Sequence, residues 1–160
     1  GSACGCLALL YAYRDADTSP VPVKMVFEAV GPSSFYPEDW KSYGFDQDPE
    51  AARGLFGVMA GKELQAEFGT PEYDQEIKDI SPLLWIDEDT VPTLMAYGKY
   101  DKFQPYEGSL RLVRTLEEMG VPHDYYLCEH SGHGLQNDNK VYAQYMRKIE
   151  EYLDTYLPIG

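Results

Sequence analysis

The stretch TLMAYGKYDKFQPYEGSLRLVRTLEEMGVPHDYYLCE, residues 93–129, combines two kinds of sequence pattern. TLMAYG (93–98) and HDYYLCE (123–129) are short apolar and aromatic runs, which are typical of strands. Between them, EGSLRLVRTLEEMG (107–120) has the spacing of an amphipathic helix that ends at Gly120. This order of elements predicts two parallel strands that are connected by a helix.

The flanking sequence extends the same alternation. VKMVFEAVG (23–31) reads as a further strand that is covered on both faces. CLALLYAY (6–13) predicts a buried helix before it, and residues 137–157 predict a long final helix with one apolar face. The sequence therefore predicts an α/β fold with a parallel sheet and helices on both faces. Because three strands make a small sheet, we expect the first strand to have an open edge.

The middle of the chain is less regular. Residues about 36–90 contain aromatic, acidic, Gly and Pro residues around two helical stretches, PEAARGLFGVMAG (49–61) and TPEYDQEIKDI (70–80). We interpret this segment as a cap-like insertion of short helices. The length of 160 residues fits one domain, so residues 1–160 are taken as a single unit.

The charge balance limits the class of partner. Lys and Arg total 13 against 27 Asp and Glu, which gives a net charge of -14. This charge argues against nucleic acid and against an anionic membrane surface as partners. No run of apolar residues is long enough for a membrane span.

Three cysteines, Cys4, Cys6 and Cys128, are an odd number at unrepeated spacing, which does not indicate a disulfide framework. They favour a reducing compartment, the cytoplasm, although an export signal could have been removed from the start of the chain. Cysteine and histidine are zinc ligands, but this spacing fits no closed zinc pattern. We therefore predict no metal and no other cofactor, and we interpret the cysteines as small core residues.

Candidate catalytic residues follow the predicted strands. Asp101 follows TLMAYG, His133 follows HDYYLCE, and Ser2 precedes the first helix. Because catalytic groups of open α/β sheets lie beyond the carboxyl ends of strands, we expect these three side chains at one edge of the sheet. Serine, aspartate and histidine in this chain order form the set needed for nucleophilic acyl transfer. No role is assigned to His123 or His130.

These residues carry a family resemblance. GSACGCLALL, the acid loop GKYDKFQP (98–105) and the histidine loop SGHG (131–134) resemble the C-terminal half of an α/β-hydrolase. The resemblance is to the esterase and lipase group that includes acetyl-xylan and feruloyl-type esterases, and it spans essentially the whole chain. ISPLLWIDEDTVPTLMAYG (80–98) also resembles the family's link from cap to acid strand. The implied fold is a parallel-sheet α/β-hydrolase fold that is incomplete at its N-terminal side.

The resemblance implies roles for individual residues. Ser2 would be the nucleophile, Asp101 the acid and His133 the base of a triad, and the N–H of Ala3 would be an oxyanion donor. The sequence departs from the family pattern at Cys4, where a second glycine is expected, and it contains no HGG-like oxyanion loop. An alternative is that Gly1 and Ser2 are the remnant of a cleaved tag.

The implied function is hydrolysis of carboxylic esters, with a small-molecule ester, such as an acylated sugar, as substrate. Two alternatives remain open at this point. One is a serine peptidase of the prolyl-oligopeptidase kind, and the other is a truncated, weakly active or inactive module. We expect the open strand to pair either with a second copy or with a missing N-terminal half, and we expect weak activity from this chain alone. The aromatic residues of FYPEDWKSYGF (35–45) line a substrate pocket or pack the cap.

Overall fold

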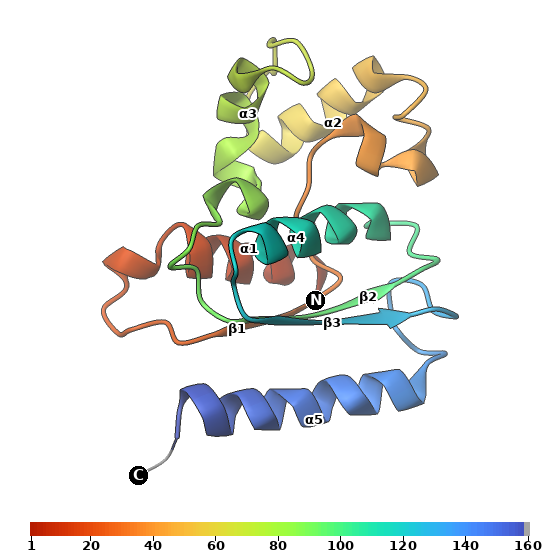
Figure 1. The fold of residues 1–160 in the computed structure, drawn as a ribbon. Coiled ribbons are helices and arrows are strands. Elements are labelled where there is room, and N and C mark those ends of the chain that lie inside the picture. Colours follow the sequence, from red (N-terminus) through yellow and green to blue (C-terminus); the bar gives the residue numbers. More distant parts are fainter. Residues whose placement is uncertain (159–160) are drawn as a thin grey trace.

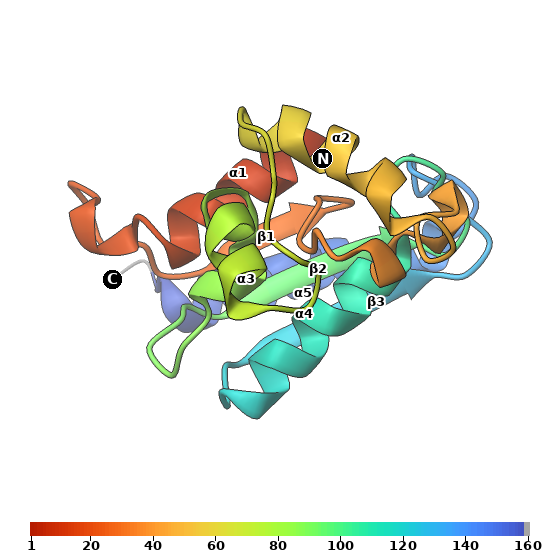
Figure 2. The same cartoon turned by 90° about the horizontal axis from the view of Figure 1, so that it is seen from above.

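The computed structural model describes residues 1–158. Its sheet has three parallel strands in the order β1-β2-β3, namely β1 (Val26–Ala29), β2 (Thr93–Gly98) and β3 (His123–Cys128). The order along the sheet follows the order along the chain (Figure 2). The predicted parallel α/β arrangement is therefore confirmed.

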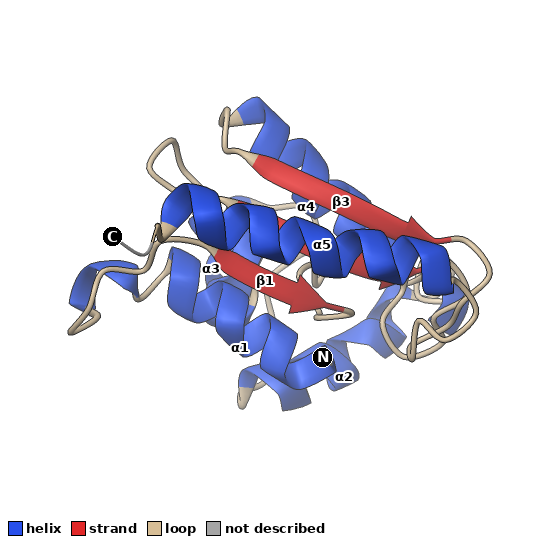
Figure 3. Ribbon diagram, turned by 90° about the horizontal axis from the view of Figure 1, so that it is seen from below, coloured by secondary structure: helices blue, strands red, loops and turns tan. Residues whose placement is uncertain are grey.

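Helices cover both faces of this sheet. Helices α1 (Ser2–Tyr13) and α4 (Tyr106–Glu118) lie on one face, and α5 (Asn139–Tyr156) lies on the other (Figure 1). Seen from below, α5 runs along the strands (Figure 3). Side chains of the central strand β2 pack on both faces of the sheet. Met95 and Tyr97 pack with α1 and α4, whereas Leu94 and Ala96 pack with α5.

The insertion between β1 and β2 forms a second layer above α1 and α4 (Figures 1 and 2). It contains α2 (Pro49–Ala60) and α3 (Pro71–Ile77). It has its own aromatic core, in which the Phe56 ring lies edge to face with Phe35, Trp40 and Phe45. Short 3₁₀ turns complete the described chain: η1 (Ala16–Thr18), η2 (Pro37–Asp39), η3 (Lys41–Tyr43), η4 (Lys78–Ile80) and η5 (Pro82–Trp85).

An ion-pair network attaches this cap to the sheet domain. Arg111 on α4 donates to the buried Asp39 and to Glu38 (2.9 Å), and its guanidinium lies over the Tyr36 ring. Because Asp39 is buried, breaking the pair from one side would leave an uncompensated charge. The pair therefore holds the start of the cap against α4.

The structure corrects several predicted boundaries. The strand predicted over 23–31 is shorter at both ends, since β1 spans Val26–Ala29. At its C-terminal end Val30 adopts a positive φ of 54°, which ends the extended conformation. The first helix begins at Ser2 rather than at residue 6. It is also buried on one side only, since Leu7 and Tyr11 are exposed where the described chain places no element against α1.

The prediction that the cysteines are small core residues is correct for one of the three. Cys128 is fully buried in β3, Cys6 is half-buried and Cys4 is exposed. The core interpretation was therefore wrong for Cys4, because the first turn of α1 presents this residue outward.

Candidate active site

The carboxyl ends of the three strands meet at one edge of the sheet. The loop after β2 carries Asp101, and the loop after β3 carries His133. The chain start lies beside the end of β1, since a Cβ atom on Gly1 would be 3.9 Å from the Ala29 carbonyl oxygen (Figure 3). All three predicted catalytic residues therefore belong to the same edge.

The structure brings Asp101 and His133 into direct contact. Nδ1 of His133 lies 2.7 Å from Oδ2 of Asp101, whose side chain is fully buried. The other carboxylate oxygen accepts the N–H groups of Phe103 (2.8 Å) and Gln104 (2.9 Å). These bonds fix the carboxylate, which in turn orients the imidazole. Within residues 1–158, Nε2 of His133 has no hydrogen-bond partner and is free to accept or donate a proton.

The loops that carry this pair lie against one another because Gly98 has no side chain. A Cβ atom there would collide with the carbonyl oxygens of Ser131 and Gly132. The close approach is secured by the N–H of Tyr100, which donates to the Ser131 carbonyl oxygen (3.0 Å). Gly98 therefore permits the contact between the acid loop and the histidine loop.

Asp138 holds the histidine loop from the other side. Its carboxylate accepts hydrogen bonds from the Ser131 hydroxyl (2.5 Å) and from the backbone N–H of His130 (2.9 Å), and it lies 2.9 Å from Nδ1 of the His130 ring. These hydrogen bonds, that from Ser131 most of all, hold the pKa of Asp138 below its usual value. Sequence reasoning missed this residue, and it gave no role to His130, which here is an exposed partner of Asp138.

Ser2 is half-buried and begins α1 with a φ of 29°, which is uncommon for a residue other than glycine. No hydrogen bond joins Ser2 to His133 among the described residues. Asp101 and His133 follow the neighbouring strands β2 and β3, whereas Ser2 lies beside the end of β1. The structure thus joins two of the three predicted residues and leaves the third on the same edge.

Ala3 is the second residue of α1 and is exposed. The first intrahelical bond is donated by Gly5 to the Gly1 carbonyl oxygen (2.9 Å). The N–H of Ala3 therefore belongs to the first turn, whose N–H groups have no partner inside the helix. Such a group is available to an oxygen atom bound at the helix start.

A mostly apolar cavity of about 320 Å³ lies beside Ser2. Its wall includes Cys6, whose Sγ contacts the Ile80 carbonyl oxygen (3.6 Å) and whose pKa burial raises to about 12. The thiol is therefore neutral, and the lining contains no charged side chain. The lining residues are Ser2, Ala3, Cys6, Leu7, Leu10, Pro32, Phe35, Met59 and Ile80.

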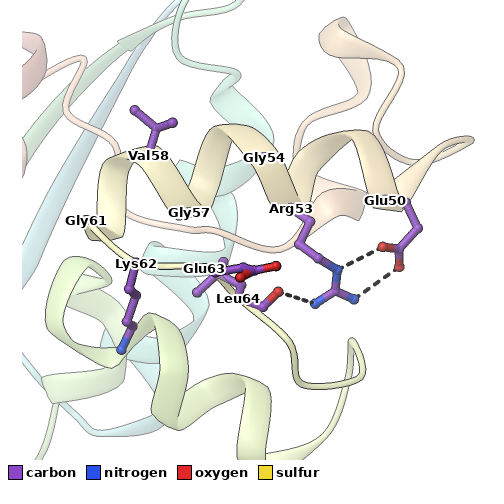
Figure 4. Close-up of a pocket in the computed structure, with 9 residues that line it drawn as sticks. All are labelled: Glu50, Arg53, Gly54, Gly57, Val58, Gly61, Lys62, Glu63 and Leu64. Carbon is purple, nitrogen blue, oxygen red and sulfur yellow. Dashed lines mark hydrogen bonds and ion pairs between the residues drawn. The ribbon is translucent and has the colours of Figure 1, made fainter.

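A larger groove of about 520 Å³ follows α2 on the cap (Figure 4). Two of its charged residues pair with each other, since Arg53 donates to Glu50, and Arg53 also donates to the Leu64 carbonyl oxygen (Figure 4). None of the predicted catalytic residues lines it, so this groove is not the candidate active site. The lining residues are Glu50, Arg53, Gly54, Gly57, Val58, Gly61, Lys62, Glu63 and Leu64.

Two absences concern residues 1–158, the part of the chain that the structure describes. No group of three or more His, Cys, Asp or Glu side chains is arranged to hold a metal ion in this part of the chain. No helix there combines the length and the apolar character that a membrane span requires.

Solved structures share this architecture. An acetyl ester-xyloside bifunctional hydrolase from Caldicellulosiruptor lactoaceticus is 19% identical with a TM-score of 0.64, and the match covers 99% of this chain and 56% of that one. The esterase Est2 from Thermogutta terrifontis is 18% identical with a TM-score of 0.69, over 100% and 54%. A puromycin-hydrolyzing peptidase from Mycobacterium tuberculosis is 21% identical with a TM-score of 0.67, over 98% and 21%.

At these identities the likeness establishes the fold. The predicted α/β-hydrolase fold in incomplete form is confirmed, because the chain spans about half the length of the two esterases and about a fifth of the peptidase. A comparison with curated proteins found no match. The sequence pattern of the prolyl oligopeptidase family matches residues 59–159, which include Asp101 and His133. The chain belongs to the prolyl oligopeptidase family.

Proposed function

We propose that this chain carries the catalytic residues of a serine hydrolase that cleaves carboxylic esters, with Ser2 as nucleophile, His133 as base and Asp101 as acid. The observation that carries the proposal is the 2.7 Å contact between His133 Nδ1 and the buried Asp101 carboxylate. A histidine oriented in this way, with its second nitrogen free, is the general base that a serine hydroxyl needs.

The backbone of Ser2 supports its assignment as nucleophile. In serine hydrolases of this fold the nucleophile stands on a strained turn between a strand and a helix. Ser2 has a positive φ at the start of α1 and lies at the edge of the sheet that carries the other two residues. A strained residue at a helix start is a reason to infer a functional role.

The reaction has two steps. In the first, Ser2 Oγ attacks the ester carbonyl carbon while His133 Nε2 takes the hydroxyl proton, and Asp101 stabilises the imidazolium. The bond to the alcohol then breaks, and the alcohol leaves with that proton. In the second step His133 takes a proton from water and the resulting hydroxide attacks the acyl carbon. The bond to Ser2 Oγ then breaks, His133 returns the proton to Ser2 Oγ, and the carboxylic acid leaves. The Ala3 N–H would stabilise the oxyanion in both steps.

An ester substrate is proposed from the cavity, since the two esterases and the peptidase match this chain to a similar extent, over 98–100% of its length. The neutral cavity beside Ser2 suits an uncharged acyl group. By analogy with the acetyl ester-xyloside hydrolase, an acylated sugar is a candidate substrate. We expect weak activity from this chain alone, because its sequence contains no HGG-like loop to supply a second oxyanion donor. Lack of one such donor typically costs about 10²–10³ in rate.

The first test is covalent labelling by a fluorophosphonate, measured by intact-mass spectrometry. A single adduct on Ser2 that is absent in Ser2→Ala and in His133→Ala would support the proposal. No adduct on the wild-type chain would contradict it. Rates with p-nitrophenyl acetate and with an aminoacyl p-nitroanilide would then separate an esterase from a peptidase.

The open edge of the sheet supports a proposal on assembly. Among the described residues β1 pairs with β2 only, so the other edge of β1 presents unpaired backbone groups. A strand from a second copy, or from an N-terminal half supplied separately, would cover it. Light scattering at increasing concentration should show self-association, and a strictly monomeric chain would contradict pairing between copies.

A further inference from the structure

Glu28 is a buried carboxyl group that the proposed reaction does not use. It lies on β1 and is 3% exposed. Its Oε2 accepts the Gly31 N–H at 2.8 Å, whereas its Oε1 is buried without a partner among the described residues. An unpaired buried carboxyl oxygen is costly, so its place in the fold calls for an explanation.

The Glu28 carboxyl packs between Gly5, at the start of α1, and Gly31, after β1. A Cβ atom on Gly5 would lie 2.9 Å from Glu28 Oε2, and one on Gly31 would lie 2.8 Å from the same oxygen. A Cβ on Gly31 would also approach the Cys6 nitrogen at 2.8 Å. The two glycines thus let the backbone of α1, the segment after β1 and the carboxyl pack together. Gly5 is only three residues from Ser2, so the position of Ser2 depends on this packing.

The surroundings favour the neutral form of the carboxyl. Burial raises the pKa of Glu28 to about 8, although the Tyr97 hydroxyl, the Gly31 N–H and the amino-terminal charge oppose this rise. The Tyr97 hydroxyl itself donates to the Gly31 carbonyl oxygen (2.7 Å). The titratable groups around Glu28 come from each neighbouring element, and they are Cys6 and Tyr13 on α1, Tyr97 on β2, Tyr125 on β3, Tyr145 on α5 and the amino group of Gly1.

The thiol and the phenols of that group stay neutral near pH 8, because burial raises the pKa of each of them. Loss of a proton at Glu28 would therefore create a negative charge with one hydrogen bond and no side-chain cation. Such a charge is relieved if water enters or if the Tyr97 hydroxyl turns away from Gly31. Either change alters the contacts of Gly31, against which the first turn of α1 packs.

We propose that Glu28 is a positioning residue whose neutral carboxyl holds the first turn of α1 against Gly31, and that ionisation of Glu28 loosens this contact and displaces Ser2. The effect on Ser2 reactivity rests on the proposed function, but the link between the proton and the backbone does not.

The first test is whether ionisation of Glu28 changes the backbone at the start of α1. It follows the amide NMR signals of Gly31 and Gly5 between pH 6 and 9.5. In the wild-type chain both should shift with a common midpoint near pH 8. In Glu28→Gln, which mimics the neutral carboxyl, this transition should be absent. In Tyr97→Phe the midpoint should move upward, because a group that stabilises the charged carboxyl is gone. A wild-type chain whose Gly31 and Gly5 signals do not titrate overturns the proposal, whatever the variants do.

The effect on Ser2 is tested by the rate of fluorophosphonate labelling over the same pH range. Relative to Glu28→Gln, the wild-type chain should lose about tenfold in rate between pH 7 and 9, since small displacements of a reacting group are costly. Glu118→Gln, a change of an exposed carboxylate, should keep the wild-type profile.

The outcomes separate the two proposals. Matching profiles for the wild-type chain and Glu28→Gln would refute a role of Glu28 in positioning Ser2. A wild-type chain that is never labelled at Ser2 would refute the proposed function, and the Gly31 and Gly5 signals would still decide whether Glu28 holds the helix start.

Discussion

The carbonyl oxygen of Gly132 lies against Gly98 at the position where any other residue would carry its Cβ atom. This contact presses the histidine loop onto the end of β2, and the Asp101–His133 hydrogen bond forms immediately beyond it. The geometry of the candidate site thus depends on a glycine that takes no part in the chemistry.

Gly98→Ala should therefore separate the two loops. We expect a loss of about 1–3 kcal/mol in the free energy of unfolding, the usual cost of overpacking, because the new methyl group meets backbone atoms. Urea denaturation measures this loss. Gly54→Ala is the matched control, because a Cβ there meets nothing within 4 Å and alanine favours a helix by about 0.5–1 kcal/mol. Equal stability of the two variants would contradict the packing argument.

Asp101→Asn should abolish most activity and keep the fold. The amide oxygen can still accept the N–H groups of Phe103 and Gln104, so the loop is retained. The amide nitrogen, however, cannot accept a proton from His133 Nδ1, which favours the wrong tautomer and typically costs about 10⁴ in kcat. Ester hydrolysis and circular dichroism check the two halves of this prediction, and activity within tenfold of the wild type would disprove the role of Asp101.

Local sequence patterns predict which segments form strands, whereas contacts between distant residues determine where some of these strands end. TLMAYG is bounded by Pro92 and Gly98 and was predicted with its full length, because apolar runs between such residues are strong strand signals. The first strand is shorter than predicted at both ends. At its C-terminal end the positive φ of Val30 belongs to a segment held by distant groups such as the Tyr97 hydroxyl. Such contacts have no local signature.

The same division applies to the site. The contact between Asp101 and His133 followed from their places after two neighbouring strands. Asp138 precedes a helix and would ordinarily be read as an N-cap, yet its side chain makes no capping bond to α5 and turns back into the loop. Glu28 did leave a signal, because an acidic residue within an apolar strand needs a special environment.

Asp138 should control stability at low pH. Its pKa is depressed in the folded chain by the bonds from Ser131 and His130, so the unfolded chain binds the proton more readily. The contribution of Asp138 is therefore present above its ordinary pKa of 3.8 and is lost as the pH falls below that value. Thermal melts of the wild-type chain from pH 2.5 to 6 should show this fall.

Two variants isolate this effect. Asp138→Asn should be less stable than the wild type at pH 6 and should show a smaller fall below pH 4. Asp154→Asn, at an exposed position on α5, should behave as the wild type. Identical curves for both variants would argue against a role of Asp138 in holding the loop.

Glu28 should make the stability of the fold depend on pH in the opposite direction from Asp138. Its pKa in the folded chain, about 8, lies above the ordinary value of 4.5, so the folded chain retains the proton that the unfolded chain loses. Stability should be full below about pH 4.5 and should fall as the pH rises toward 8, by an amount on the order of a few kcal/mol. Chemical denaturation at pH 5 and pH 8.5 measures the fall. Glu28→Gln should not show it, and a wild-type chain with equal stability at both values would contradict a buried, neutral Glu28.

Cys6 should set the size of acyl group that the cavity beside Ser2 accepts. Cys6→Leu adds apolar volume to the wall without adding charge, so the ratio of kcat/KM for a butanoate ester to that for an acetate ester should fall about tenfold or more, as expected for lost room of one or two methylene groups. Cys4→Leu is the matched control, because Cys4 is exposed and does not line the cavity. Iodoacetamide supplies an independent check, since a thiol with its pKa raised to about 12 should react far more slowly than the exposed Cys4. An unchanged chain-length preference in Cys6→Leu would mean that the acyl group binds elsewhere.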